Sequence, residues 1–417
     1  MRASIEYMTG PTELPSLPDA RLAGLLEEAR ALQPRTVALR RELHQHPELG
    51  LTLPRTQEAV VAELEGLPLE ITRGTTTTSV TAVLRGGKPG PAVLLRGDMD
   101  ALPLTEDTGV EFASDVPGVM HACGHDTHVA MLASAARLLS SHVEELAGSV
   151  VFMFQPGEEG HHGARHMIHE GVLDAAGTRV ERALALHVHA NLPSGLVTTR
   201  TGPVMAAADT FDIRVVGSGG HASMPYNAVD PIPAAAELVG ALQTMVTRRI
   251  DVFDPAVVSV TRIAAGTTSN VIPESAELSG TIRTMSARTR ALVHEELPKV
   301  CENVGAAHGC QVLTDIEPGY PPTVNSPEQA ARVLQLAAEV LGADNVEPMP
   351  APIMGAEDFS YVLQRVPGAF AFLGTCPSGT DPAQAAANHS NRVHYDEAAL
   401  ANGVAMYAAF ALDALRG

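Results

Sequence analysis

The sequence predicts an α/β protein: a mostly parallel sheet covered by helices, interrupted by an inserted ferredoxin-like domain. Three observations lead to this fold class. Continuous apolar runs of strand length alternate with helix-like segments, which is typical of a parallel sheet buried on both faces. The middle of the chain changes to a βαββαβ rhythm, the ferredoxin-like pattern. A chain of 417 residues also exceeds the usual size of one domain, so two domains are expected.

The first half of the chain supplies the predicted sheet. Helical periodicity comes first, in residues 21–33 and again in 34–46. A further helix is expected over residues 128–147. Three apolar runs are predicted strands, and they cover residues 91–98, 149–155 and 183–189. Ligands of such sheets bind beyond the carboxyl ends of the strands, and a polar cluster stands at the end of each run.

Residues 205–315 are predicted to form the inserted domain. Its expected elements are a strand at 209–216, a helix at 230–249, strands at 256–263 and 277–284, a helix at 288–307 and a strand at 310–316. Residues 19–204 and 316–417 are then expected to form the sheet domain, which ends with a helix at 327–341, a strand at 369–373 and a helix at 396–414. The first 18 or so residues are expected to form a polar leader outside this fold.

Composition excludes several classes of protein. With 45% hydrophobic and 18% charged residues, the chain is an ordinary globular one. A net charge of −20 argues against nucleic acid and anionic membranes as partners. No apolar run is long enough for a membrane span, and the N-terminus lacks the apolar core of a signal peptide. Four scattered cysteines without a signal make a disulfide framework unexpected, so a cytoplasmic location is predicted.

Two short motifs carry the chemistry, MHACGHDTH at residues 120–128 and FQPGEEG at residues 154–160. They bring together a thiolate, imidazoles and adjacent carboxylates, which are the donors that divalent transition metals select. Cys123 and His125 stand two apart at the mouth of a predicted helix. Glu158 and Glu159 are neighbours on an extended segment and point to opposite sides, so one can bind metal while the other faces the reacting water.

Further candidate residues follow the other two strands. His187 lies inside an apolar strand, where an imidazole needs a partner such as a metal. His189 is on the same face, and spacing alone does not choose between them. Asp98 and Asp100 are interpreted as metal ligands, as groups that orient ligand imidazoles, or as caps of the strand end. His389 lies in a loop and is a weak signal by itself.

Nine motifs then occur in one order: HQHPELG, RGDMDALP, MHACGHDTH, FQPGEEG, GGHASMP, SNVIPE, GTIRT, GYPPTVN and MGAEDFSY. Together they resemble the metal-dependent amidohydrolases of the aminoacylase family, in the branch of hippurate hydrolase and the indoleacetyl-amino-acid hydrolases. The resemblance runs from about residue 40 to the C-terminus. One departure is HVHANLP at residues 187–193, which lacks the first proline of the family segment.

The resemblance implies a role for each matching residue. Glu158 is implied to be the general base, and Gly355 to belong to a pocket loop. Asp98 stands where other branches carry a ligand histidine. The implied metal ligands are Cys123, His125, Glu159, His187 and His389. The lid residues implied to bind the substrate carboxylate or the oxyanion are His221, Asn270 and Arg283, and His221 is expected to act in cis or from a partner subunit.

The resemblance also implies an activity. The sheet domain would bind two divalent metal ions (Zn, Mn, Co or Ni) and hydrolyse the amide bond of small N-acyl amino acids to a carboxylic acid and an amino acid. The inserted domain would act as a lid and form a homodimer. A dipeptidase or exopeptidase is the alternative enzyme, and a catalytically idle metal-dependent binding protein is the alternative from another class.

Overall fold

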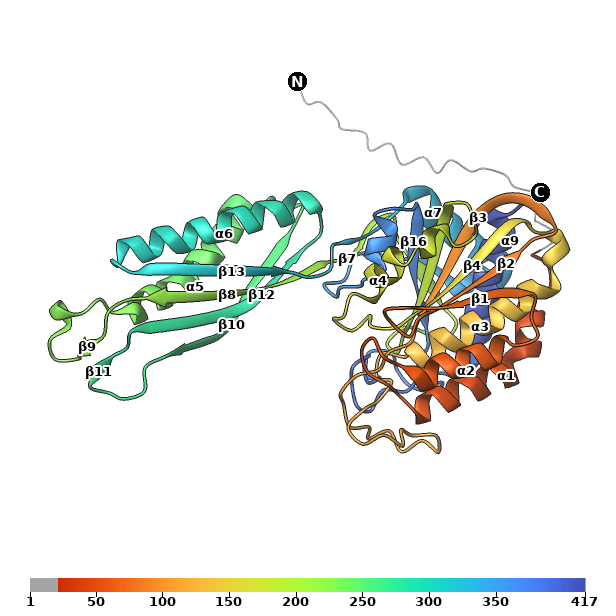
Figure 1. Ribbon diagram of the computed structural model, residues 1–417, viewed down its shortest axis with the longest axis horizontal. Helices are drawn as coiled ribbons and strands as arrows, with labels where there is room; N and C mark the ends of the chain where they lie inside the picture. The colour runs from red at the N-terminus through yellow and green to blue at the C-terminus, as the bar shows by residue number, and fades with distance from the viewer. Residues whose placement is uncertain (1–21, 417) are drawn as a thin grey trace, which may run out of the picture.

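The computed structural model describes residues 22–416, so the expected leader lies outside the described residues. Figure 1 shows a large sheet enclosed by helices and a smaller sheet with its own helices. Two adjacent segments of the chain connect the two bodies. The predicted fold class is confirmed.

The large sheet has the strand order β1-β2-β4-β3-β5-β16-β6-β15. Strand β3 pairs in parallel with β4 and β5, and β5 pairs in parallel with β16. The three predicted apolar runs are therefore neighbours, and their carboxyl ends meet at one edge. The strands are β1 (Leu69–Arg73), β2 (Val80–Arg85), β3 (Lys88–Asp98), β4 (Ala147–Gln155), β5 (Val180–His189), β6 (Val197–Thr199), β15 (Val346–Pro348) and β16 (Gly368–Gly374).

Helices cover both faces of this sheet, which explains the continuous apolar strands. In β3, Val93 and Leu95 belong to one core, whereas Leu94 belongs to the core on the opposite face. The first core includes residues of α1 (Leu25–Gln45), α2 (Pro54–Leu64), α3 (His125–Ser141), α7 (Pro327–Leu341) and α9 (Leu400–Ala414). The second includes residues of α4 (Gly163–His169) and α8 (Ser360–Leu363).

Two predicted helix boundaries differ from the structure. The two early periodic segments form the single helix α1, with Pro34 inside it. Proline removes one backbone donor and disfavours a helix interior, but the apolar face continues across it and packs on the core. The helix expected at 128–147 begins at His125, directly after Gly124 in a left-handed conformation (φ 85°), and ends at Ser141.

The inserted domain has the predicted βαββαβ order. Its strands form a four-stranded antiparallel sheet in the order β10-β12-β8-β13. A two-stranded ribbon of β9 (Gly220–His221) and β11 (Val271–Ile272) lies at its far end (Figure 1). The main elements are β8 (Ala207–Val216), α5 (Pro231–Arg249), β10 (Ala256–Ala265), β12 (Ser275–Thr284), α6 (Ala287–Ala307) and β13 (Gln311–Pro318).

The chain enters and leaves the inserted domain side by side. Strand β7 (Gly202–Met205) leads into β8, and β14 (Thr323–Asn325) follows β13. These two strands pair with each other in antiparallel fashion. The domain limits given above stay a prediction.

Within residues 22–416 no helix has both the length and the apolar character needed to cross a membrane, and the four cysteines are free thiols.

Candidate metal centre

The candidate site lies at the carboxyl edge of the large sheet. Asp98 ends β3, Gln155 ends β4, and His187 lies near the end of β5. A cavity of about 500 Å³ opens at this edge. Its polar lining residues are Cys123, Glu158, Glu159, His187, His189, Arg283, Tyr320, Glu357, Asn388 and His389.

The five predicted metal ligands gather in two overlapping groups. The donor atoms of Cys123, His125 and His187 lie within 4.8 Å of one another, and so do those of Cys123, Glu159 and His389. The Cys123 Sγ atom lies 3.4 Å from His187 Nε2 and 3.2 Å from His389 Nε2. His389 Nε2 is also 3.3 Å from Glu159 Oε1. Two groups that share one thiolate are suited to a pair of metal ions.

Hydrogen bonds leave the imidazoles free to bind metal through Nε2. His125 Nδ1 lies 2.8 Å from the Asp100 carbonyl oxygen, and His187 Nδ1 lies 2.8 Å from that of Val188. A carbonyl only accepts, so each Nδ1 donates its proton there, and Nε2 is the nitrogen left to bind a metal. The buried Nε2 of His125 has no hydrogen-bond partner among the described residues. This orphaned acceptor and the inward-facing donors fit a bound cation.

Burial favours the neutral forms of two of the metal-donor side chains, Cys123 and His187. Burial, together with the nearby carboxylates of Glu159 and Asp98, raises the pKa of the Cys123 thiol to about 12, although His125 acts in the opposite direction. Burial also holds the pKa of His187 well below its usual range, so its imidazole is neutral. A thiol of this kind becomes a thiolate when a metal binds it.

Asp100 holds the two adjacent glutamates in place. Its Oδ1 atom accepts the Glu158 N–H at 2.9 Å, and its Oδ2 atom accepts the Glu159 N–H at 3.0 Å. The Asp100 carboxylate therefore orients the backbone of the two glutamates rather than a ligand imidazole. Glu158 is 6% exposed. Burial raises the pKa of its carboxyl group well above the usual range, and the nearby acids Glu357, Glu159 and Asp358 raise it further.

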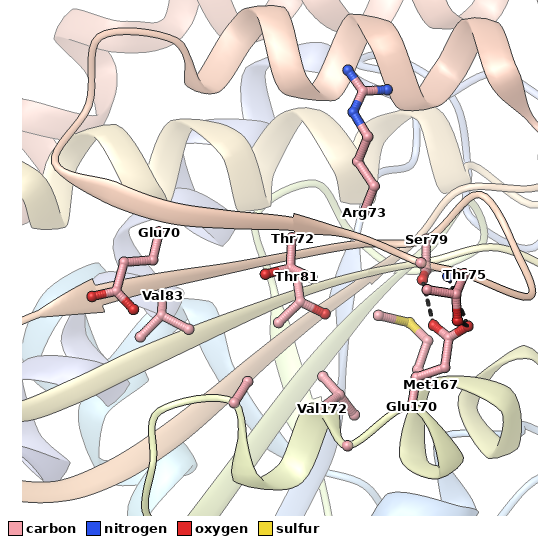
Figure 2. A pocket seen from close by; sticks show the side chains of 13 residues that line it. Glu70, Thr72, Arg73, Thr75, Ser79, Thr81, Val83, Met167, Glu170 and Val172 are labelled. Carbon is pink, nitrogen blue, oxygen red and sulfur yellow. Dashed lines mark hydrogen bonds between the residues drawn. The ribbon is translucent and has the colours of Figure 1, made fainter.

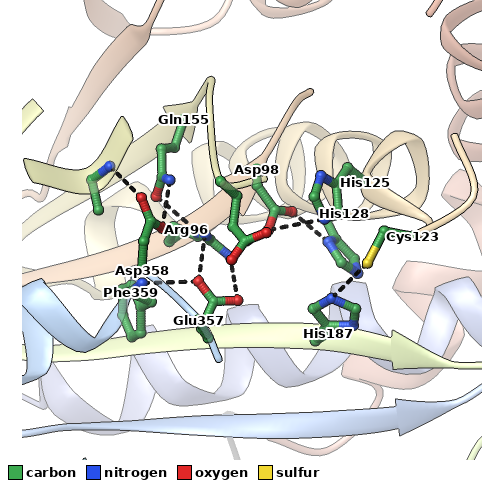
Figure 3. Close-up of polar contacts among 12 residues, drawn as sticks. Arg96, Asp98, Cys123, His125, His128, Gln155, His187, Glu357, Asp358 and Phe359 are labelled. Atoms are coloured by element: carbon green, nitrogen blue, oxygen red, sulfur yellow. Dashed lines mark hydrogen bonds and ion pairs between the residues drawn. The ribbon is translucent and has the colours of Figure 1, made fainter. Parts of the chain in front are cut away.

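A buried ionic cluster underlies the site, and the sequence interpretation missed it. Arg96 is fully buried and donates to Asp98, Glu357 and Asp358 at 2.6, 2.8 and 3.1 Å, as Figure 3 shows. It also donates to Gln155 at 2.9 Å. The charged residues of the cluster belong to the motifs RGDMDALP and MGAEDFSY. Nothing local in either motif, however, indicates that their charged residues meet.

Asp98 contacts a neighbouring arginine and two histidines beneath the donor cluster. Its Oδ2 atom accepts from Arg96, and its Oδ1 atom lies 2.5 Å from Nδ1 of His128. The Val188 N–H donates to Nε2 of His128 at 2.8 Å, so both nitrogens of this buried histidine are used. Asp98 Oδ2 is 3.5 Å from His125 Nε2. These contacts favour an orienting role for Asp98 over direct metal binding.

The structure distinguishes His187 from His189. His187 joins the donor group of Cys123 and His125. His189 lines the cavity, but its Nδ1 accepts the Asn191 N–H at 3.2 Å and it belongs to none of the donor groups found among the described residues. The geometry therefore favours His187 as the ligand from β5.

Substituting these two histidines should have different effects on metal binding. We expect H187A to weaken metal binding by at least about tenfold. Loss of a residue that only supports a ligand typically costs about 10–100-fold in metal affinity, and loss of a ligand itself should cost no less. We expect H189A to bind metal like the parent protein. Metal content after dialysis, measured on both purified variants, checks this. Equal loss in the two variants would contradict the assignment of His187.

The predicted substrate residues are divided between two places. Arg283 and Gly355 line the cavity beside the donor cluster. His221 and Asn270 are exposed on the β9–β11 ribbon at the far end of the inserted domain, away from this cavity (Figure 1). His221 Nδ1 lies 2.7 Å from the Ser223 hydroxyl. In this arrangement, His221 and Asn270 do not contribute to the cavity of their own chain.

A second cavity of about 280 Å³ lies beside the edge strand β1 and its neighbour β2 (Figure 2). Glu170 is one of its charged residues, and a single carboxylate oxygen of Glu170 accepts from the N–H groups of Thr75 and Thr76 at 2.9 and 2.6 Å. None of the donor groups found among the described residues lies there. This cavity therefore lacks the chemistry of the first.

A mostly parallel α/β sheet with a thiolate, imidazole and carboxylate cluster beside a buried glutamate defines a metal-dependent hydrolase. Residues 94–413 match the model of peptidase family M20/M25/M40, and the chain belongs to this family. The resemblance drawn from the motifs is thereby confirmed.

The curated relatives of this chain include proteins named as a carboxypeptidase, a deacetylase and an amino acid hydrolase. Thermostable carboxypeptidase 1 of Saccharolobus solfataricus is 38% identical over 93% of this chain and 97% of its own length. N-acetylcysteine deacetylase of Bacillus subtilis is 39% identical over 84% and 90%, respectively. IAA-amino acid hydrolase ILR1-like 4 of Arabidopsis thaliana is 37% identical over 90% and 84%. The chain is a metal-dependent amidohydrolase of this family.

A solved structure supports the metal content. A dinuclear metal-binding peptidase of the M20 family from Bacillus subtilis superposes with a TM-score of 0.80 and 34% identity, over 93% of this chain and 99% of that chain. Together with the two donor groups that share Cys123, this similarity supports a site for two divalent metal ions.

Proposed function

We propose that this enzyme hydrolyses the amide bond of small N-acyl amino acids and releases a carboxylic acid and an amino acid. The observation that carries the proposal is Glu158, a buried carboxylate in the same cavity as the metal donors, next to Glu159 in sequence. The deacetylase and the IAA-amino acid hydrolase among the relatives support this substrate class.

The proposed mechanism divides the work among the chain's own residues. Cys123, His125, Glu159, His187 and His389 would hold two divalent ions, for which we propose Zn, Mn, Co or Ni. Metals in such sites polarise the substrate carbonyl and lower the pKa of water towards about 7. Glu158 takes a proton from the attacking water and delivers it to the leaving nitrogen. Asp100 keeps Glu158 on the cavity side by holding its backbone N–H.

Arg283 is proposed to bind the carboxylate of the substrate. It lines the cavity, and its guanidinium group has no hydrogen-bond or ion-pair partner among residues 22–416. A guanidinium group binds a carboxylate through two parallel hydrogen bonds. Gly355 also lines the cavity, and a Cβ added at this position would come within 2.9 Å of Met205 Cε. A side chain at this position would therefore narrow the pocket.

Removal of the Arg283 charge should weaken the use of carboxylate substrates. We expect R283M to lower kcat/KM for N-acyl amino acids by about 10–150-fold, the equivalent of a charged hydrogen bond of about 1.5–3 kcal/mol. The same substrates with an amide in place of the carboxylate should lose less. Steady-state kinetics on the paired substrates check this, and an equal loss on both would argue against the carboxylate contact.

The inserted domain is proposed to be a lid that also forms a homodimer. His221 and Asn270, implied by the resemblance to bind substrate, stand on its far ribbon. They would reach a cavity either by closure of this domain or from a second copy of the chain. A cytoplasmic location, predicted from the sequence, stays part of this proposal.

Carboxypeptidase or dipeptidase activity is the second candidate, because two relatives are carboxypeptidases. A hydrolysis screen separates the candidates. N-acetyl, N-benzoyl and N-indoleacetyl amino acids are compared with dipeptides of the same C-terminal residue, each with added Mn, Co, Ni and Zn. We expect the N-acyl amino acids to have the higher kcat/KM. A clear preference for dipeptides would overturn the proposed substrate class.

A further inference from the structure

The backbone of Glu158 is hydrogen-bonded at both of its polar groups. Its N–H donates to Asp100 Oδ1, while its carbonyl accepts from the Tyr320 hydroxyl at 2.5 Å and from the Gly160 N–H at 2.8 Å. Tyr320 is 7% exposed and lines the cavity with Glu158. Burial raises the pKa of the Tyr320 phenol, which therefore stays a hydrogen-bond donor.

Tyr320 belongs to the segment that leaves the inserted domain. Strand β13 ends two residues earlier, at Pro318. The Tyr320 carbonyl accepts the Ala208 N–H at 3.0 Å, and the Gly319 N–H donates to Asp209 Oδ1 at 2.9 Å. Ala208 and Asp209 open the strand that enters the domain. Hydrogen bonds therefore join the segment that enters the inserted domain to the segment that leaves it, next to Tyr320.

Asp209 in turn ties this junction to helix α6 of the inserted domain. It is 2% exposed, and its carboxylate pairs with Arg290 at 2.5 Å and with His294 at 2.8 Å. Arg290 also donates to the Gly319 carbonyl at 3.1 Å. Hydrogen bonds thus lead from α6 through Asp209 to Gly319, and the next residue in the chain, Tyr320, donates to the Glu158 carbonyl.

We propose that Tyr320 is a positioning residue, which couples the orientation of the inserted domain to the placement of Glu158. The inference rests on the proposed function, in which Glu158 is the general base. If the inserted domain rotates about the two segments that connect it to the sheet domain, Tyr320 moves with it. The hydrogen bond from Tyr320 then shifts the backbone of Glu158. General-base catalysis requires the carboxylate within hydrogen-bond reach of the water, so such a shift changes turnover.

The first test removes only the hydroxyl group. We expect Y320F to lower kcat about tenfold, as loss of one hydrogen bond can do, with KM within about twofold and unchanged metal content. The control is Y407F, which removes another buried phenol that donates to a backbone carbonyl, that of Arg96 at 2.6 Å. It should cost similar thermal stability and leave kcat within about twofold.

A rise in KM with unchanged kcat in Y320F would mean that Tyr320 binds substrate, and a kcat equal to that of Y407F would mean that it is only structural. Either result overturns the inference. If E158Q keeps its activity, the proposed function fails. If E158Q is inactive while Y320F matches Y407F, this inference fails alone.

The second test measures coupling to the inserted domain. D209N weakens the ion pairs with α6, and we expect it to lower kcat about threefold in the parent protein and less than about 1.5-fold in the Y320F background. The same factor in both backgrounds would contradict coupling through Tyr320. Because D209N keeps the shape of the side chain, this cycle is informative even if Y320F is less stable than Y407F.

Discussion

Replacing Glu158 with glutamine is expected to abolish turnover while the protein still binds metal. General acid–base catalysis contributes about 10²–10⁴-fold, so kcat of E158Q should fall by at least about a hundredfold. Glutamine keeps the shape and the backbone contacts of Glu158 but cannot take a proton from water. The measurement is hydrolysis of an N-acyl amino acid, together with the metal content of the same sample.

The matched control is E159Q, because the neighbouring carboxylate is a proposed metal ligand. E159Q should lose metal, whereas E158Q should keep it. E158Q should also be at least as stable as the parent protein, because a neutral amide replaces a buried carboxyl group whose ionisation is disfavoured by burial and by the nearby acids Glu357 and Asp358. Activity of E158Q above a few per cent, or metal loss equal to that of E159Q, would contradict the division of roles between the two glutamates.

Removing the Arg96 charge is expected to have the largest effect on stability. Arg96 is fully buried and faces three carboxylates, those of Asp98, Glu357 and Asp358. Burial by itself would raise the pKa of Asp98, but Arg96, His125 and His128 lower it well below the usual range. In R96M the buried Asp98 carboxylate and the two neighbouring acids lose their main partner, and we expect the free energy of unfolding to fall by about 3–5 kcal/mol.

An exposed arginine of the same sheet provides the comparison for R96M. Arg85 pairs with Glu70 at 2.7 Å, but both side chains are largely exposed. We expect R85M to cost at most about 1 kcal/mol, as exposed ion pairs do. Denaturant unfolding of both variants checks the difference. A loss below about 1 kcal/mol in R96M would mean that the cluster does not depend on its single arginine.

Much of the fold followed from local patterns. The runs at 91–98, 149–155 and 183–189 predict strands, because burial on both faces of a sheet favours continuous apolar segments. Their adjacency then placed three polar clusters at one edge, which is where the metal donors lie. The inserted domain was visible because its βαββαβ order lies in one continuous segment.

Other features depend on contacts between distant segments. His187 and His189 share a face of β5, and the Cys123 loop, rather than the strand, distinguishes them. Arg96 meets Glu357 and Asp358 only after folding, so neither motif alone indicates the cluster. Tyr320 gained no role from the sequence because its partner is a backbone carbonyl. The setting of His221 depends on the orientation of a whole domain, which no local pattern describes.

The most direct test of the account is a metal titration of the chelated protein, followed by hydrolysis of an N-acyl amino acid such as N-benzoylglycine. The proposal predicts that the metal-free protein is inactive and that activity rises with added Mn, Co, Ni or Zn until two ions are bound per chain. C123A, which removes the donor shared by both groups, should prevent this recovery. Full activity in the metal-free protein would contradict the central claim.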